Sequence, residues 1–318
     1  MTVAQSSILP AGIYTPITTF FKNDDDYTLD LEAQVQHTQF LYNNGISGLV
    51  VAGSMGETPH LSQKERHDLV AALRKGVPDK SFKLIAGAPP MGSIDEAVAE
   101  SESASDAGAD FIILLIPGYF GSSLISQEGI IDYFSRVADK SALPVIIYNY
   151  PGTTNNVSIT YDTYKKLSTH PNIVAVKLTH FNLDLYTLLG KDHELCETNN
   201  FRPFTGLGQV LLPAMSVGIY GAIDGMSALF PKVMVKLYTL IREEKYKEAS
   251  ELQYLVTRAD MMIMELNVVG VKHALKQFYN FGECLTGRPP LSKSVDLEAY
   301  AKHEANLKVL DKLEKSLK

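Results

Sequence analysis

Short, strongly apolar segments recur from residue 12 to residue 226, and each interval between them is long enough for one helix. Several, such as 109–117 (ADFIILLIP) and 143–151 (LPVIIYNYP), are continuously apolar, which is typical of parallel strands covered on both faces. We therefore predict eight parallel strands. Their ranges are 12–20, 45–53, 83–89, 109–117, 143–151, 173–180, 201–206 and 218–226.

Two of the intervening segments begin with a helix-capping pattern. Ser62 stands three residues before Glu65, and Ser93 three residues before Glu96, so each pair can form a capping box. Eight strand–helix units within about 230 residues match a (β/α)8 TIM barrel better than an open doubly wound sheet. The sequence therefore predicts an α/β protein with a barrel domain over residues 1–230, in which 201–206 has the weakest strand pattern.

The strand pattern stops near residue 230. Residues 229–266 and 268–282 have the periodicity of amphipathic helices, GRPPLSKS (287–294) interrupts the chain, and a final helix is expected up to Lys318. We predict that residues 231–318 form a C-terminal helical region. With roughly 80 residues, this region has too small a core to predict that it folds independently of the barrel.

The composition argues against several classes of protein. The formal net charge is −7, with acidic and basic residues interspersed, which disfavours nucleic acid or a membrane surface as a partner. The longest apolar run is far shorter than the roughly 20 residues of a membrane span. Two cysteines, Cys196 and Cys284, provide no disulfide framework. Since the N-terminal MTVAQSSILPAG also lacks the features of a secretory signal, we expect a cytoplasmic protein.

Catalytic groups of a TIM barrel lie at the carboxyl ends of its strands. Four such ends carry polar or glycine-rich sequence: GSMGE (53–57), PGYF (117–120), YNYPG (148–152) and VKLT (176–179). Lys177 lies inside an apolar strand, where its amine must be neutral, paired or able to reach solvent. If it points into the barrel, burial favours the neutral amine, which is a nucleophile toward carbonyl groups.

The order and spacing of five motifs resemble those of the dihydrodipicolinate synthase and N-acetylneuraminate lyase family. The motifs are GSMGE, the following HLSxxER, IPGYF, YNYPG and VKL. Members of that family are class I aldolases that handle pyruvate through a Schiff base. The resemblance covers essentially the whole chain, including its helical C-terminus. It implies a small-molecule 2-oxo acid as substrate and assembly into a homodimer or homotetramer.

The resemblance implies catalytic roles for four side chains. Lys177 would form an imine with the C2 carbonyl of the 2-oxo acid, so that cleavage of the C3–C4 bond leaves an enamine. Tyr148 would be the general acid and base. Ser54 would connect it by hydrogen bonds to Tyr119, which in the family reaches across a dimer interface. Hydroxyl groups suit such a chain because each one both donates and accepts.

The resemblance also implies a substrate-binding set. The N–H groups of Ser54 and Met55 would bind the carboxylate, unless the glycines around them only make a tight turn. The backbones of Gly206 and Ile223 match positions that line the family's pocket. Thr179, two residues after the lysine, matches a contact to substrate hydroxyls, or is a strand residue with a satisfied hydroxyl.

Two departures select among the family's members. Synthases carry an arginine five residues after the catalytic tyrosine, where it binds the carboxylate of aspartate semialdehyde. This chain has Thr153 there and no arginine between residues 148 and 177. Met55 stands where a threonine hydroxyl usually assists the carboxylate, so either the amides suffice or the pocket differs there.

These choices favour an aldolase that releases pyruvate from a hydroxylated 2-oxo acid. A 2-keto-3-deoxy-hexonate, such as the L-galactonate derivative, is the preferred substrate. The alternative is 4-hydroxy-2-oxoglutarate, which would give glyoxylate. Condensation of the dihydrodipicolinate synthase type and an inactive homologue that binds a 2-oxo acid are further alternatives.

The sequence indicates no metal and no cofactor. The histidines are scattered, and the one dense patch, 192–197 (DHELCE), lies away from the predicted strand ends. The glycines of TGLGQ and GAIDG are too weak a pattern to predict a nucleotide, flavin or pyridoxal group. His60 is a candidate for the mouth of the pocket, and Glu57 is expected to support its loop.

Overall fold

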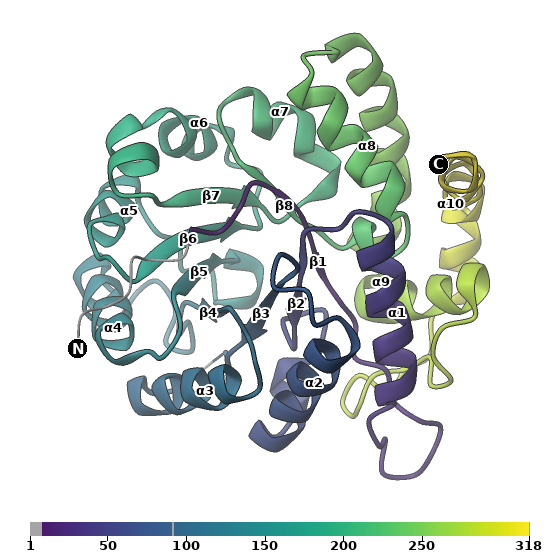
Figure 1. Ribbon diagram of the computed structural model, residues 1–318, viewed down its shortest axis with the longest axis horizontal. Coiled ribbons are helices and arrows are strands. Elements are labelled where there is room, and N and C mark those ends of the chain that lie inside the picture. The colour runs from purple at the N-terminus through teal and green to yellow at the C-terminus, as the bar shows by residue number, and fades with distance from the viewer. Residues whose placement is uncertain (1–7, 91, 318) are drawn as a thin grey trace.

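The structure is a computed structural model, and it describes residues 8–90 and 92–317. Its strands are all parallel and close into one barrel in the order β1 to β8 (Figure 1), which confirms the predicted fold. Each strand lies within its predicted range, including the weakly patterned seventh. The strands are β1 Gly12–Pro16, β2 Gly48–Val51, β3 Lys83–Gly87, β4 Phe111–Leu115, β5 Val145–Asn149, β6 Ile173–Leu178, β7 Arg202–Thr205 and β8 Gly221–Ile223.

Helices follow the strands and form a ring around the barrel (Figure 1). Both predicted capping boxes are present, at the starts of α2 and α3. In α4, Ile130, Phe134 and Val137 recur at helical spacing and are buried, so this helix packs through one apolar face. The helices are α1 Leu31–Asn43, α2 Gln63–Gly76, α3 Ile94–Asp106, α4 Gln127–Lys140, α5 Tyr161–Ser168, α6 Leu183–Lys191, α7 Leu211–Ser216 and α8 Pro231–Arg242.

The predicted C-terminal region, residues 231–318, contains α8, α9 (Tyr246–Tyr279) and α10 (Leu297–Ser316), which pack on one another. Asn267 interrupts α9 with φ 49° and ψ −137°, which is the position where the helical pattern of the sequence breaks. Because α8 packs against β1, it completes the ring of helices around the barrel. The division of the chain after residue 230 stays a prediction.

A buried ion pair joins the C-terminal region to the barrel. Lys272 of α9 donates from Nζ to Glu57 Oε1 at 2.7 Å, and both side chains are almost fully buried. Glu57 Oε2 accepts the backbone N–H of Arg288 at 2.9 Å, and the Arg288 guanidinium also binds Glu65 at the start of α2. The loop that carries GSMGE is therefore held from α9 and from the segment after it, which agrees with the supporting role expected for Glu57.

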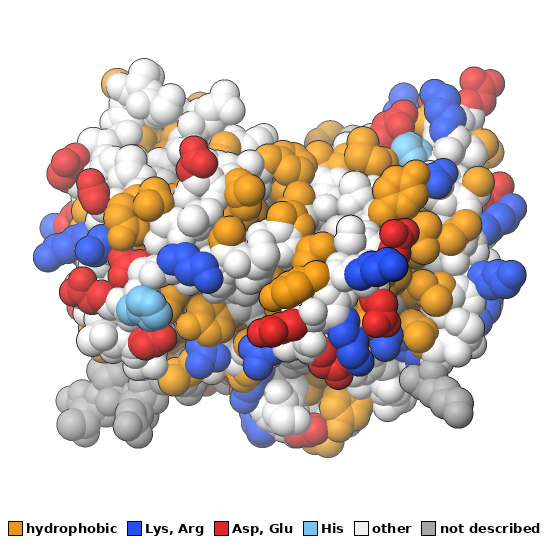
Figure 2. All heavy atoms as spheres, turned by 90° about the horizontal axis from the view of Figure 1, so that it is seen from above, with side chains coloured by type: hydrophobic (Ala, Val, Ile, Leu, Met, Phe, Trp, Pro, Cys, Tyr) orange, Lys and Arg blue, Asp and Glu red, His pale blue; other side chains and the backbone are white. Residues whose placement is uncertain are grey.

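The surface carries acidic and basic side chains scattered among apolar ones on the face shown in Figure 2. No helix within the described ranges is long and apolar enough to cross a membrane. The expectation of a cytoplasmic protein rests in part on the N-terminal segment. Most of that segment, residues 1–7, lies outside the described residues.

Replacing Lys272 by methionine should destabilise the protein by about 3–5 kcal/mol, because it leaves the Glu57 carboxylate buried without its cation. Urea denaturation followed by circular dichroism measures this loss. Adding Glu57→Gln to Lys272→Met should restore part of the stability, since it removes the uncompensated charge.

Lys64→Met is the matched control for Lys272→Met. Lys64 pairs with Asp68 on the surface of α2, and such exposed pairs contribute about 0–1 kcal/mol. Equal, small effects of both lysine substitutions would contradict a structural role for the buried pair.

Candidate active site

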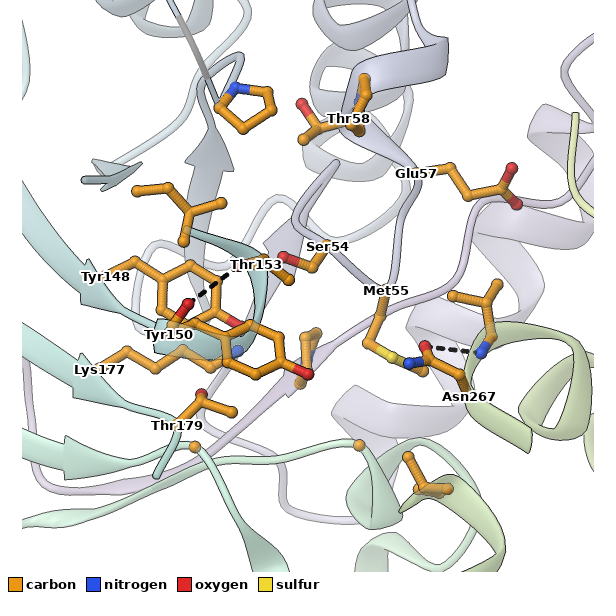
Figure 3. Close-up of a pocket in the computed structure, with 18 of the residues that line it drawn as sticks. Ser54, Met55, Glu57, Thr58, Tyr148, Tyr150, Thr153, Lys177, Thr179 and Asn267 are labelled. Atoms are coloured by element: carbon orange, nitrogen blue, oxygen red, sulfur yellow. Dashed lines mark hydrogen bonds between the residues drawn. The ribbon is translucent and has the colours of Figure 1, made fainter. Parts of the chain in front are cut away.

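A cavity of about 530 Å³ opens at the carboxyl ends of the barrel strands (Figure 3). Its walls come from the ends of β5 and β6, from the loops after β2 and β7, and from α9. The predicted residues Lys177, Tyr148, Ser54, Met55 and Thr179 all line it. The predicted Gly206 and His60 line it as well.

Lys177 and Tyr148 lie side by side because β5 and β6 pair in parallel with these two residues opposite each other. Lys177 is only 5% exposed, and its Nζ lies over the Tyr148 ring, 4.4 Å from the centroid. An aromatic face attracts a lysine ammonium and so offsets part of the cost of burying it. The structure thus places the predicted nucleophile inside the barrel mouth and not in solvent.

Tyr148 stacks on Tyr150, with the ring centroids 5.9 Å apart and an interplanar angle of 26°. Tyr150 also lines the cavity, and burial raises the pKa of its hydroxyl. Sequence reasoning missed Tyr150, although it lies within the YNYPG segment. Residues 148 and 150 point to the same side only if the extended strand continues past Asn149, and the sequence did not show that it does.

The loop after β2 presents backbone donors to the cavity. Ser54 and Met55 are half-buried, and no described residue accepts a hydrogen bond from either backbone N–H group. The left-handed conformation in this loop falls on Ala52 (φ 52°) and Glu57 (φ 57°), not on the glycines between them. Gly56 is needed for close approach instead, since a Cβ there would lie 2.9 Å from the Ala52 Cα.

Thr179 and Gly206 form the adjoining wall. The Thr179 Oγ1 atom is buried and has no hydrogen-bond partner among the described residues. A Cβ on residue 206 would lie 1.9 Å from that oxygen, so the hydroxyl occupies the space that glycine leaves. The unpaired Oγ1 is free to bind a hydroxyl of a ligand.

Two predicted site residues lie outside this cavity. Tyr119, in the loop after β4, is 68% exposed and packs edge-on against Phe120. Ile223 is fully buried with the side chains that fill the barrel interior. Among the described residues, no hydrogen bonds connect the hydroxyls of Tyr148, Ser54 and Tyr119, so the relay between them stays a prediction.

The cavity also has a wall that sequence reasoning did not assign to it. Asp260 and Asn267, both from α9, line the space opposite the strand ends. Figure 3 shows Asn267 beside Met55, with the Asn267 Oδ1 accepting the N–H of Val268 at 2.9 Å. The available signals were an aspartate on the apolar face of a predicted helix and an asparagine at the break in its periodicity.

Few groups in the cavity carry charge. Lys177 is the only lysine or arginine among the described residues that line it. Burial raises the pKa of Asp260 to about 7, with the nearby Asp224 carboxyl adding to the effect. No cluster of three or more histidine, cysteine or acidic side chains suited to a metal ion occurs in the described part of the chain.

Comparisons with known proteins agree with this geometry. The profile of the Dihydrodipicolinate synthetase family matches residues 9–310. The probable mitochondrial 4-hydroxy-2-oxoglutarate aldolase of Emericella nidulans is 32% identical, over 95% of this chain and 96% of that protein. The L-threo-3-deoxy-hexylosonate aldolase of Aspergillus niger is 29% identical, over 97% of each chain.

A solved structure shows the same architecture. The 4-hydroxy-tetrahydrodipicolinate synthase of Methylacidiphilum fumariolicum SolV has a TM-score of 0.86 and 30% identity, over 97% of this chain and 99% of that chain. The resemblance inferred from the motifs is confirmed. From the match along nearly its whole length, the chain belongs to the dihydrodipicolinate synthetase family.

Proposed function

We propose that the protein is a Schiff-base-forming aldolase that reversibly cleaves a 2-keto-3-deoxy sugar acid, such as 2-keto-3-deoxy-L-galactonate, to pyruvate and an aldehyde. The observation that carries this proposal is the buried Lys177 amine beside the Tyr148 ring at the floor of the cavity. An amine in such a position is available to attack a bound carbonyl group.

In the proposed reaction, Lys177 Nζ adds to the C2 carbonyl of the 2-oxo acid and water leaves, which forms an imine. Tyr148 removes the proton of the C4 hydroxyl, the C3–C4 bond breaks, and its electron pair moves into the protonated imine to give an enamine. The aldehyde departs. Protonation of C3 and hydrolysis of the imine then release pyruvate and restore the lysine.

The substrate carboxylate would bind to the loop after β2. The backbone N–H groups of Ser54 and Met55 lack partners in the described chain and lie at the cavity, so they can donate to a carboxylate together. This arrangement uses no side chain at residue 55. Met55 in place of the threonine expected there is therefore compatible with binding through the amides alone.

The walls of the cavity favour an aldehyde that carries hydroxyl groups and no charge. Thr153 lines the cavity where an arginine would be needed to bind the carboxylate of an aldehyde partner. The unpaired Thr179 hydroxyl and the Asp260 carboxyl are instead suited to binding hydroxyl groups. These features disfavour condensation of the dihydrodipicolinate synthase type.

A 4-hydroxy-2-oxoglutarate aldolase is the second candidate. Its support is the Emericella nidulans relative with that name, which is 32% identical to this chain. The first candidate has the Aspergillus niger L-threo-3-deoxy-hexylosonate aldolase as its named relative. The relative from Emericella nidulans is named as mitochondrial, and a cytoplasmic location for this chain stays a prediction.

Reduction with borohydride in the presence of pyruvate should attach pyruvate covalently to Lys177, because borohydride reduces an imine to a stable amine. Peptide mass mapping locates the adduct. Lys177→Arg should abolish it, whereas Lys83→Arg, at the opposite end of the barrel on β3, should not. An adduct on another residue, or none, would refute the imine mechanism.

Tyr148→Phe should lower kcat for cleavage of the 2-keto-3-deoxy-hexonate by about 10²–10⁴-fold, which is the usual contribution of a positioned general acid or base. The borohydride adduct with pyruvate should still form at equilibrium, since Lys177 remains. Steady-state kinetics on both candidate substrates measures the loss. Unchanged turnover would show that the proton is transferred by another group.

We also propose that Tyr119 acts in the cavity of a neighbouring subunit. Its support is the position of the ring, which is exposed with Phe120 on a loop that does not line the cavity of its own chain. Assembly into a homodimer or homotetramer would bury this aromatic pair and complete the predicted hydroxyl relay.

Mixing Lys177→Ala subunits with Tyr119→Phe subunits tests this arrangement. In a mixed dimer, one site combines an intact Lys177 with the neighbour's intact Tyr119, so activity should exceed that of either variant alone. Mixing Lys177→Ala with Tyr148→Phe is the control and should restore nothing, because both residues belong to one chain's site. Absence of recovery in the first mixture would place Tyr119 in its own subunit's site or outside catalysis.

A further inference from the structure

Asp260 presents a fixed, unsatisfied carboxyl oxygen at the cavity. Its side chain lines the cavity and is 5% exposed. Its Oδ2 atom accepts the backbone N–H of Gln209 at 3.0 Å, while no described residue donates to Oδ1. The bond to Gln209 therefore orients the carboxyl group and leaves its second oxygen for a ligand.

The loop that holds Asp260 is itself tied to α9. Gln253, two turns before Asp260, donates to the Gly208 carbonyl at 3.0 Å and accepts the N–H of Leu212 at 2.8 Å. Thr257 donates to the Gln209 carbonyl at 2.9 Å. Because these bonds join the same helix to the same loop, the Asp260 carboxyl has little freedom to turn away from the cavity.

A second carboxyl group lies directly behind this part of the wall. Asp224 is fully buried, its Oδ1 accepts the N–H of Ser227, and its Oδ2 has no hydrogen-bond partner among the described residues. A Cβ on Gly208 would lie 2.9 Å from Asp224 Oδ1, so only glycine leaves room for this carboxyl at the cavity wall. Burial raises the pKa of Asp224 to about 6.

The charges around the cavity disfavour a second anionic group on the substrate. Lys177, the only lysine or arginine among the described lining residues, is bound to C2 as the protonated imine and is not free to pair with a second group. A carboxylate on the aldehyde part would thus face Asp260 across the cavity with no free cation to pair with it, and the buried Asp224 carboxyl behind the wall would add to the repulsion when ionised. A hydroxyl group can donate to ionised Asp260 or accept from protonated Asp260, so it pairs with Oδ1 in either state.

We infer that Asp260 is a specificity-determining residue, whose Oδ1 binds a hydroxyl group of an uncharged hydroxyaldehyde and whose charge rejects anionic aldehydes such as glyoxylate. This inference rests on the proposed aldolase function and deepens it. It assigns substrate selection to a residue of the C-terminal helical region, opposite the strand ends that carry the chemistry.

Glycolaldehyde and glyoxylate form a matched pair for the test, since they differ only by a hydroxymethyl group in place of a carboxylate. The wild-type protein, assayed at about pH 8 so that Asp260 is ionised, should condense pyruvate with glycolaldehyde at least about tenfold more efficiently than with glyoxylate. Asp260→Asn keeps an acceptor for the Gln209 N–H and removes the charge. It should reduce this ratio of kcat/KM by about tenfold or reverse it.

Glu265→Gln is the control variant. Glu265 lies on the same helix, pairs with His303 at the surface, and does not line the cavity. Replacing it by glutamine removes one negative charge, as Asp260→Asn does. The ratio should not change in this variant. An unchanged ratio in Asp260→Asn, or the same change in both variants, overturns the inference.

The borohydride adduct separates this inference from the proposed function. If wild-type protein forms no pyruvate adduct on Lys177, the proposed function fails, and the inference fails with it. If the adduct forms normally and the wild-type protein prefers glyoxylate, the imine mechanism stands, the inference is refuted, and the second candidate substrate is favoured over the first. If Asp260→Asn does not fold, that wild-type preference for glyoxylate still overturns the inference.

Discussion

The ion pair between Lys272 and Glu57 joins the two parts of the protein that form the candidate active site. Glu57 ends the loop in which Ser54 and Met55 line the cavity, and Lys272 belongs to the helix that supplies the opposite wall. Burying two charges is unfavourable unless they are paired and hydrogen-bonded, so neither partner is tolerated without the other. Burial lowers the pKa of Lys272, and the Glu57 carboxylate opposes that shift. The depth of the cavity therefore depends on the docking of α9 on the barrel.

Closure of the barrel determines the chemistry at the cavity floor. Parallel pairing of β5 and β6 places Tyr148 opposite Lys177, so the two side chains meet at the same level inside the barrel mouth. The apolar side chains that fill the barrel below them exclude water from the lower side of the lysine. An amine in this position is approached only from the cavity, where a bound 2-oxo acid would present its carbonyl group.

Much of the fold could be predicted because its signals are local. Recurring apolar segments indicated all eight strands, the seventh most weakly, and the spacing of Ser62 and Ser93 from their glutamates indicated two capped helices. The position of Lys177 at a strand end could also be predicted. Contacts between distant segments could not, since Asp260 reaches the cavity only through the packing of α9 on the loop after β7. The backbone of Ile223 was expected to line the pocket, and this stays a prediction, while its side chain lies in the barrel interior.

By itself, the sequence determined the eight-fold alternation of strands and helices and the order of the four motifs along them. These features depend on short-range periodicity and on residue types, which can be read without coordinates. Only the tertiary structure decided which side chains share the cavity. Closing the barrel and docking α9 bring together residues that are more than 200 positions apart, such as Glu57 and Lys272. The same long-range packing left Tyr119 exposed on the surface, outside the cavity of its own chain.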